Sequence, residues 1–221
     1  MPSPWHYLTR APMKLRKVYF PTPAERLHIG SGPENLAGWV NIDIVRYPGV
    51  NCVLDVRRGL PFKDVRFIFA EHFIEHLDLN AAMYLFLEAR RVLRDDGVLR
   101  LSTPNLDWVW ASHYNLGASK PESVGDCFKL NGAFHAWGHQ FLYNEATLTS
   151  LLLEAGFANV VTCEYGHSAH PDLRGLERHE RSDDFEGLAD ILIVEASGRG
   201  GSAPAHLESP RAEFLHNLGA R

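Results

Sequence analysis

The apolar positions in the first half of the chain follow two different periods. Short apolar runs end at Ile29, Asp43 and Asp55, and a longer run covers 65–70, as is typical of buried parallel strands. From 81 to 93 the apolar residues instead recur every three to four positions, which predicts an amphipathic helix packed on a core. Strands and a helix of this kind predict a layered α/β protein with a mostly parallel sheet.

The boundaries of these elements also follow from local chemistry. Asn80 is predicted as the N-cap of the helix, and Asp95-Asp96-Gly97 as its end, before a further strand over 98–105. Between the strands that end at Ile29 and Asp43 there is room for only a turn or two of helix. We therefore expect short first crossovers.

The second half of the chain changes its pattern twice. From 106 to 142 the periodicity fails and Trp, His and Gly are frequent. Asn144 then caps a helix that Gly156 ends, and two strand-like runs at 159–165 and 189–197 predict a closing pair. The predicted organisation is an arm over 1–25, a domain over 26–197 with an aromatic and His-rich insertion over 106–142, and a flexible tail over 198–221 with a short terminal helix from Arg211.

Composition narrows the class of protein. The 221 residues carry a formal net charge of -5, which gives no general attraction to nucleic acid or to an anionic membrane. Lys14, Arg16 and Lys17 form the one short basic run of the arm. No apolar run approaches the roughly 20 residues of a membrane span. The three cysteines are widely separated, which favours a cytoplasmic location and argues against a cysteine zinc site.

The first candidate site is the turn Gly30-Ser31-Gly32. Glycines let the chain reverse and bring backbone N–H groups close to a ligand, and Asp43 ends the next strand, where a carboxylate can accept ribose hydroxyls. A dinucleotide fingerprint needs a third glycine and an acidic residue about 20 positions on, and neither is present. By itself this turn is as consistent with an ordinary strand connection as with a cofactor site.

The second candidate site follows the strand at 65–70 and contains Glu71, His72, Glu75 and His76. Four titratable side chains after a buried strand can supply a base, an acid or a cofactor contact; alternatively, Glu75 and His76 open the next helix. The two histidines stand four apart, but the order H-F-I-E-H is not H-E-x-x-H and the sequence offers no third ligand. No metal is therefore expected.

The insertion over 106–142 has two interpretations. Long connections usually cover a site or carry specificity, and its aromatic side chains are suited to wall a substrate pocket in which His139 offers a titratable group. Equally, these aromatic side chains form a satellite core with solvated histidines. The aromatic residues concerned are Trp108, Trp110, Tyr114, Phe134 and Trp137.

Five stretches, in this order, resemble class I S-adenosylmethionine-dependent methyltransferases, and most closely the small bacterial ones of unassigned substrate. They are HIGSGPENLAGWVNIDI, VLDVRRGLPF, AEHFIEHL, EARRVLRDDGVLRLSTPN and FLYNEATLTSLLLEAGF. The resemblance covers about 26–197. It implies a Rossmann-like α/β fold, with a mostly parallel sheet, helices on both faces, a closing antiparallel strand pair and short first crossovers.

The resemblance also implies where S-adenosylmethionine binds. The turn Gly30-Ser31-Gly32 would hold the methionine part, Asp43 the ribose hydroxyls, and Ile44 would pack beside the adenine. The remaining cofactor contacts are Asp55 and Val56 at the adenine edge, and Ala70, Glu71 and His72 at the strand end beneath the sulfonium. The sequence departs from the family's longer glycine pattern, since Pro33 follows a single G-x-G.

The predicted activity is methyl transfer to an oxygen or nitrogen nucleophile of a small-molecule or sugar-like acceptor. If the acceptor needs a general base, the candidates are His72, His139 and Glu75, in that order. Two alternatives stay open: an NAD(P)-dependent oxidoreductase, which the missing third glycine disfavours, and a non-catalytic cofactor-binding domain on the same fold. The acceptor and the oligomeric state are not predicted.

Overall fold

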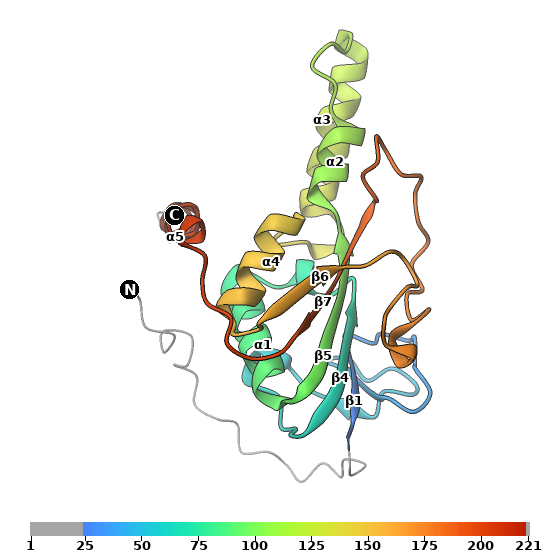
Figure 1. The fold of residues 1–221 in the computed structure, drawn as a ribbon. Helices are drawn as coiled ribbons and strands as arrows, with labels where there is room; N and C mark the ends of the chain where they lie inside the picture. The colour runs from blue at the N-terminus through green and yellow to red at the C-terminus, as the bar shows by residue number, and fades with distance from the viewer. Residues whose placement is uncertain (1–23, 220–221) are drawn as a thin grey trace.

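A computed structural model describes residues 24–219, and within them seven strands form one sheet in the order β3-β2-β1-β4-β5-β7-β6 (Figure 1). The predicted arm over 1–25, with its basic run, lies outside the described residues except for its last two. The strands are β1 (Arg26–Ile29), β2 (Val40–Asp43), β3 (Cys52–Val53), β4 (Val65–Glu71), β5 (Leu93–Pro104), β6 (Asn159–Thr162) and β7 (Ile191–Ser197). The α-helices are α1 (Leu79–Val92), α2 (Leu106–His113), α3 (Lys120–His135), α4 (Glu145–Glu154) and α5 (Ala205–Gly219).

The pairing of the strands confirms the predicted mixed sheet. β1 lies between β2 and β4 in parallel pairing, and β3 and β5 extend the parallel part on either side. β7 inserts antiparallel between β5 and β6, which makes the predicted closing pair. Because the first five strands are parallel, their carboxyl ends meet at one edge of the sheet, where ligands bind in open sheets of this type.

One face of the sheet is covered by helices. The apolar stripe of α1, including Ala82, Met83 and Phe86, is buried in the same core as Leu148 and Leu151 of α4. Leu207, the buried residue of α5, and the partly buried Phe214 join this core, and Figure 1 shows α1 and α4 on the same side of the strands. This face therefore forms the main hydrophobic core.

The resemblance implied helices on both faces, but the other face is covered by connecting segments rather than by α-helices. Phe67 and Phe69 of β4 pack there with Trp39, which belongs to the short first crossover, and with Leu173 and Leu176 of the segment after β6. The helical element of this second segment is a single turn, η5 (Pro171–Leu173). The first crossover is short, as predicted, and this length leaves no room for a helix on that face.

Three local boundaries differ from the prediction. β3 ends at Val53, so Asp55 lies beyond the strand and caps the turn η2 (Val56–Arg58). β5 begins at Leu93, so Asp95-Asp96-Gly97 lies within this strand and does not end the helix before it. Helix α5 begins at Ala205, earlier than the short terminal helix predicted from Arg211.

The insertion is helical, which the sequence pattern did not predict. Helices α2 and α3 extend together beyond the end of the sheet (Figure 1). No residue of α3 is buried, so it has no apolar stripe by which periodicity could reveal it. Its local signals are the capping box of Ser119 and Glu122 and Pro121 in the first turn. No helix in the described part of the chain is long and apolar enough to cross a membrane.

The N-cap of α1 is Asp78, not the predicted Asn80. Asp78 Oδ1 accepts a hydrogen bond of 2.8 Å from the backbone N–H of Ala81, and Asn80 lies inside the helix. We expect Asp78→Ala to lower the free energy of unfolding by about 1 kcal/mol, because a donor at the helix start loses its partner. Asn80→Ala is the matched control and should leave it unchanged or raise it slightly. Urea unfolding of both variants checks this; an equal loss for Asn80→Ala would contradict the assignment.

Candidate functional site

A cavity of about 230 Å³ lies beyond the carboxyl ends of β1, β2 and β3. The end of β2 and the residues that follow β1, β2 and β3 form one side of it, and the turn after β4 closes it with Phe73, His76 and Leu77. The residues on the first side are Gly30, Ile42, Asp43, Ile44, Leu54, Asp55, Val56 and Arg57. The lining is largely apolar with two carboxylates, a composition that suits a flat ring joined to a polyhydroxylated group.

The glycine turn is built for close approach. Gly30 has a φ of +67°, and a Cβ at this position would stand 2.2 Å from Cδ2 of Phe73, so the aromatic ring lies directly against the bare backbone. Gly32 has a φ of +52° and a Cβ there would meet nothing within 4 Å. The first glycine is therefore required by packing, and the second by its left-handed backbone.

Asp43 fixes the shape of this turn. Its Oδ2 accepts a hydrogen bond of 2.9 Å from the N–H of Gly32, and its Oδ1 accepts one of 2.8 Å from the N–H of Val45. The carboxylate thus joins the end of β2 to the turn after β1. Each oxygen keeps acceptor capacity for a further donor, such as a hydroxyl in the cavity.

Asp55 is held by its neighbour Arg57. Its oxygens accept hydrogen bonds from Nε of Arg57 at 2.8 Å and from Nη2 at 3.1 Å. The hydrogen bond to this guanidinium, together with the Arg57 N–H and its charge, keeps the pKa of Asp55 below its ordinary value despite partial burial. Asp55 is therefore ionised at neutral pH and its orientation is fixed.

Five of the ten predicted cofactor residues line this cavity, and five do not. Gly30, Asp43, Ile44, Asp55 and Val56 line it. Ser31, Gly32, Ala70, Glu71 and His72 are not part of its lining. His76, named in the second candidate site, also lines the cavity. The cavity residues that sequence reasoning missed include Leu54 and Phe73; Leu54 directly precedes the predicted Asp55, whereas nothing local marks Phe73.

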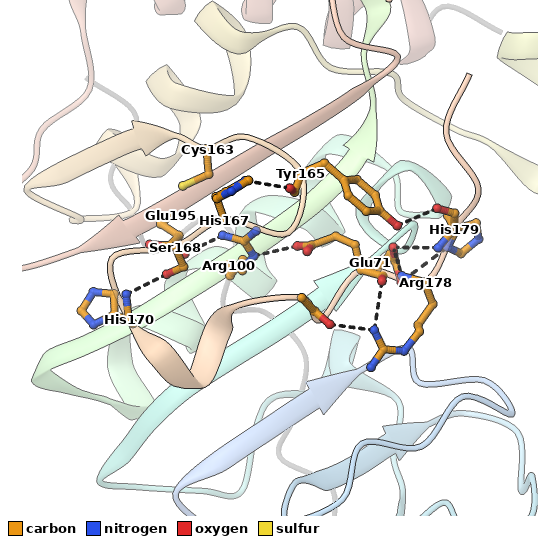
Figure 2. Close-up of polar contacts among 12 residues, drawn as sticks. Glu71, Arg100, Cys163, Tyr165, His167, Ser168, His170, Arg178, His179 and Glu195 are labelled. Carbon is orange, nitrogen blue, oxygen red and sulfur yellow. Dashed lines mark hydrogen bonds and ion pairs between the residues drawn. The ribbon is translucent and has the colours of Figure 1, made fainter. Parts of the chain in front are cut away.

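Glu71 holds the long segment between β6 and β7. Its carboxylate accepts hydrogen bonds from the backbone N–H groups of Arg178 and His179, at 2.9 to 3.1 Å (Figure 2). In the same figure Tyr165 donates its hydroxyl to the carbonyl of His179. Glu71 thus ties the end of β4 to a segment more than a hundred residues later in the chain.

Two of the three candidate bases form a pair. Nδ1 of His72 lies 3.2 Å from Oε1 of Glu75, and Oε2 of Glu75 accepts a hydrogen bond of 3.0 Å from Thr103. The ring of His72 stacks on that of His179 with 3.9 Å between centroids, and its Nε2 is buried without a hydrogen-bond partner among the described residues. His72 also has a φ of +45°, a conformation that a non-glycine residue adopts only when its surroundings impose it.

The third candidate base, His139, lies beside His76 rather than His72. The two ring centroids are 5.1 Å apart, and one ligand atom each of Glu75, His76 and His139 lie within 4.8 Å of one another. Sequence spacing offered no third ligand next to the histidines after β4, and the fold supplies one from the end of the insertion.

The aromatic residues of the insertion line neither the cavity beyond β1 to β3 nor a second cavity next to β6. Trp110 and Trp137 are 56% and 80% exposed, and none of the five aromatic residues proposed for a pocket is among the cavity linings. The second cavity, of about 510 Å³, lies instead against the end of β6 and is lined by Cys163, Tyr165 and Arg181 among others.

No protein-family model matches the sequence, and no curated protein sequence does. Among solved structures, a SAM-dependent methyltransferase from Archaeoglobus fulgidus is similar with a TM-score of 0.50 and 15% identity, over 77% of this chain and 84% of that chain. A SAM-dependent methyltransferase, possible histamine N-methyltransferase, from Thermotoga maritima has a TM-score of 0.49 and 17% identity, over 79% and 82%. The CurJ carbon methyltransferase has a TM-score of 0.44 and 16% identity. The match covers 82% of this chain but only 50% of the CurJ chain.

The mixed seven-stranded sheet with its antiparallel β7 and the likeness to the Archaeoglobus structure agree with the resemblance found in the sequence. The chain therefore has the fold of the class I S-adenosylmethionine-dependent methyltransferases.

Proposed function

We propose that this protein is a methyltransferase that binds S-adenosylmethionine in the cavity at the carboxyl ends of β1 to β3. The observation that carries the proposal is the lining of that cavity, which joins Gly30 of the glycine turn, Asp43 and the pair Asp55-Val56 in one space. In this arrangement Asp43 accepts the ribose hydroxyls, and Ile44 and Val56 pack against the adenine.

The methyl group of a sulfonium is already activated, so the protein mainly has to align the acceptor and exclude water. Alignment of this kind supplies about 7–11 kcal/mol of barrier lowering, more than the 10²–10⁴-fold that a general base typically adds. The acceptor that we propose is an oxygen or nitrogen nucleophile of a small or sugar-like molecule. His72, held by Glu75, is the first candidate to take its proton, because Nε2 of His72 has no described hydrogen-bond partner.

A cytoplasmic location is part of the same proposal. Cys52, Cys127 and Cys163 are all free, and none of them is placed to form a disulfide with another. Free cysteines, one of them exposed, are typical of a reducing compartment.

Ligand-induced stabilisation tests the proposed function. At 100 times its dissociation constant, S-adenosylhomocysteine should stabilise the protein by about 2.7 kcal/mol. For a chain of this size that corresponds to a rise of about 5–10 °C in melting temperature. NAD⁺ and NADP⁺ at the same concentration should give no rise.

Three results would contradict this account. No shift with either S-adenosylmethionine or S-adenosylhomocysteine at millimolar concentration would overturn the cofactor assignment, and a shift with a nicotinamide dinucleotide alone would favour an oxidoreductase. Cofactor binding without methyl transfer to any component of a cell extract, followed with labelled S-adenosylmethionine, would indicate a non-catalytic binding domain.

A further inference from the structure

We propose that Glu75, His76 and His139 bind one divalent first-row metal ion, such as Zn²⁺, beside the cofactor cavity. One ligand atom from each of these side chains lies within 4.8 Å of the other two, and no other such group of histidine, cysteine and acidic side chains occurs within residues 24–219. Two histidines and one carboxylate, with further positions open, form a ligand set that Zn²⁺ and other first-row ions use in catalytic sites.

The placement of the two imidazole rings fits a shared ion. Their centroids are 5.1 Å apart and their planes are inclined by 65°. With metal–nitrogen bonds of about 2.0–2.1 Å and a tetrahedral angle, two imidazoles on one ion have centroids about 5 Å apart. The ring centroids are therefore at the separation of two imidazole ligands on one ion.

His139 is oriented as a metal ligand usually is. Its Nδ1 lies 2.7 Å from the carbonyl oxygen of Ala133, which can only accept, so Nδ1 carries a proton and, in the neutral ring, Nε2 has the free lone pair. A ligand histidine typically donates its second nitrogen to a carbonyl in this way, which fixes its tautomer.

The backbone holds His139 next to the turn after β4. Gln140 donates its N–H to the carbonyl of Glu75 at 2.7 Å and its side-chain amide to the carbonyl of His76 at 2.6 Å. Between the end of α3 and Gln140, Trp137 and Gly138 have φ values of +56° and +83°. A tryptophan in the left-handed region is strained by about 1–3 kcal/mol, which the surrounding structure imposes to bring the two segments together.

The buried carboxylate of Glu75 has acceptor capacity left for a metal ion. Its residue is 0% exposed, and although Thr103 binds Oε2, no described residue makes a hydrogen bond to Oε1. Oε1 approaches Nδ1 of His72 at 3.2 Å. A carboxylate oxygen has two lone pairs, so Oε1 can face His72 and still bind a metal ion, and ligand carboxylates are themselves commonly held by a hydroxyl such as that of Thr103.

The position of the ion suggests its use, and this part rests on the proposed function. His76 lines both the proposed metal site and the cofactor cavity. An acceptor with a hydroxyl or phenol oxygen would complete the coordination of the ion and would thereby be held next to the methyl donor.

Metal binding is tested directly on the full chain after treatment with a chelator. Titration with Co²⁺ should produce visible d–d absorption that saturates at one ion per chain, and Zn²⁺ should displace it. We expect His76→Gln and His139→Gln each to weaken Zn²⁺ binding more than about 100-fold in calorimetry, since loss of a direct ligand exceeds the 10–100-fold of an outer-shell change. The control is His167→Gln, because the side chain of His167 is 77% exposed. The affinity of this variant for Zn²⁺ should equal that of the unmodified protein.

The outcomes separate the two proposals. If the folded protein binds S-adenosylhomocysteine but neither Co²⁺ nor Zn²⁺, or if His167→Gln weakens metal binding as much as His139→Gln does, the metal site is refuted and the methyltransferase assignment stands. If the metal binds at one ion per chain but S-adenosylhomocysteine does not bind, the proposed function fails and the metal site stands. Circular dichroism confirms that the glutamine variants are folded.

Discussion

Replacing Arg100 with methionine should lower the free energy of unfolding by about 3–5 kcal/mol. Arg100 is 0% exposed and donates from Nε to Glu177 at 2.7 Å. It also donates from Nη1 to Glu195 at 2.6 Å (Figure 2). Burial alone would lower the pKa of Arg100, but the hydrogen bonds and charges of the two glutamates outweigh it and raise that pKa. Without the guanidinium, two buried carboxylates face each other without a counter-charge.

Urea unfolding at neutral pH measures this loss. Arg46→Met removes a guanidinium from an exposed position and should change stability by no more than about 0.5 kcal/mol. The triple variant with Arg100→Met, Glu177→Gln and Glu195→Gln should recover much of the stability, because the uncompensated charges are gone. If Arg100→Met behaves like Arg46→Met, the buried triad does not hold the segment after β6 to the sheet.

Asp43→Asn should weaken the binding of S-adenosylhomocysteine by about 10- to 100-fold, or roughly 1.5–3 kcal/mol. Asparagine has one acceptor oxygen in place of two, so it cannot accept from the N–H groups of both Gly32 and Val45. The substitution also removes the negative charge that strengthens hydrogen bonds from ribose hydroxyls. Calorimetry at a temperature where the variant is fully folded separates this effect from the loss of stability.

Glu34→Gln is the matched control for Asp43→Asn. Glu34 is exposed on the same turn, and the substitution removes the same charge. Its affinity for S-adenosylhomocysteine should equal that of the unmodified protein. Equal weakening in both variants would mean that net charge, rather than the position of Asp43, governs binding.

The parts of this fold that depend on neighbouring residues could be predicted from the sequence. The strand ends at Ile29 and Asp43 are where the apolar runs place them, and Asn144 caps α4 by accepting from the N–H of Thr147. The parallel order of the first strands follows from their alternation with connections, so the edge at which the cavity lies was predictable as well.

The parts that depend on contacts distant in sequence could not be predicted. The partners of Arg100 are 77 and 95 residues away, and His139 reaches His76 from the end of an insertion whose α3 has no buried stripe. Even within one turn, Asp78 and Asn80 are both acceptable caps, and only the backbone decides which side chain faces the N–H of Ala81. Local chemistry therefore identified candidate residues after each strand, whereas tertiary packing decided which of them face the cavity.

A crystal structure of the protein with S-adenosylhomocysteine tests the central claim most directly. The account predicts that the ribose hydroxyls lie within hydrogen-bond distance of Asp43 and that the adenine packs between Ile44 and Val56, in the cavity beyond β1, β2 and β3. A nucleoside bound instead in the cavity lined by Cys163 and Tyr165, or no ligand at saturating concentration, would contradict it.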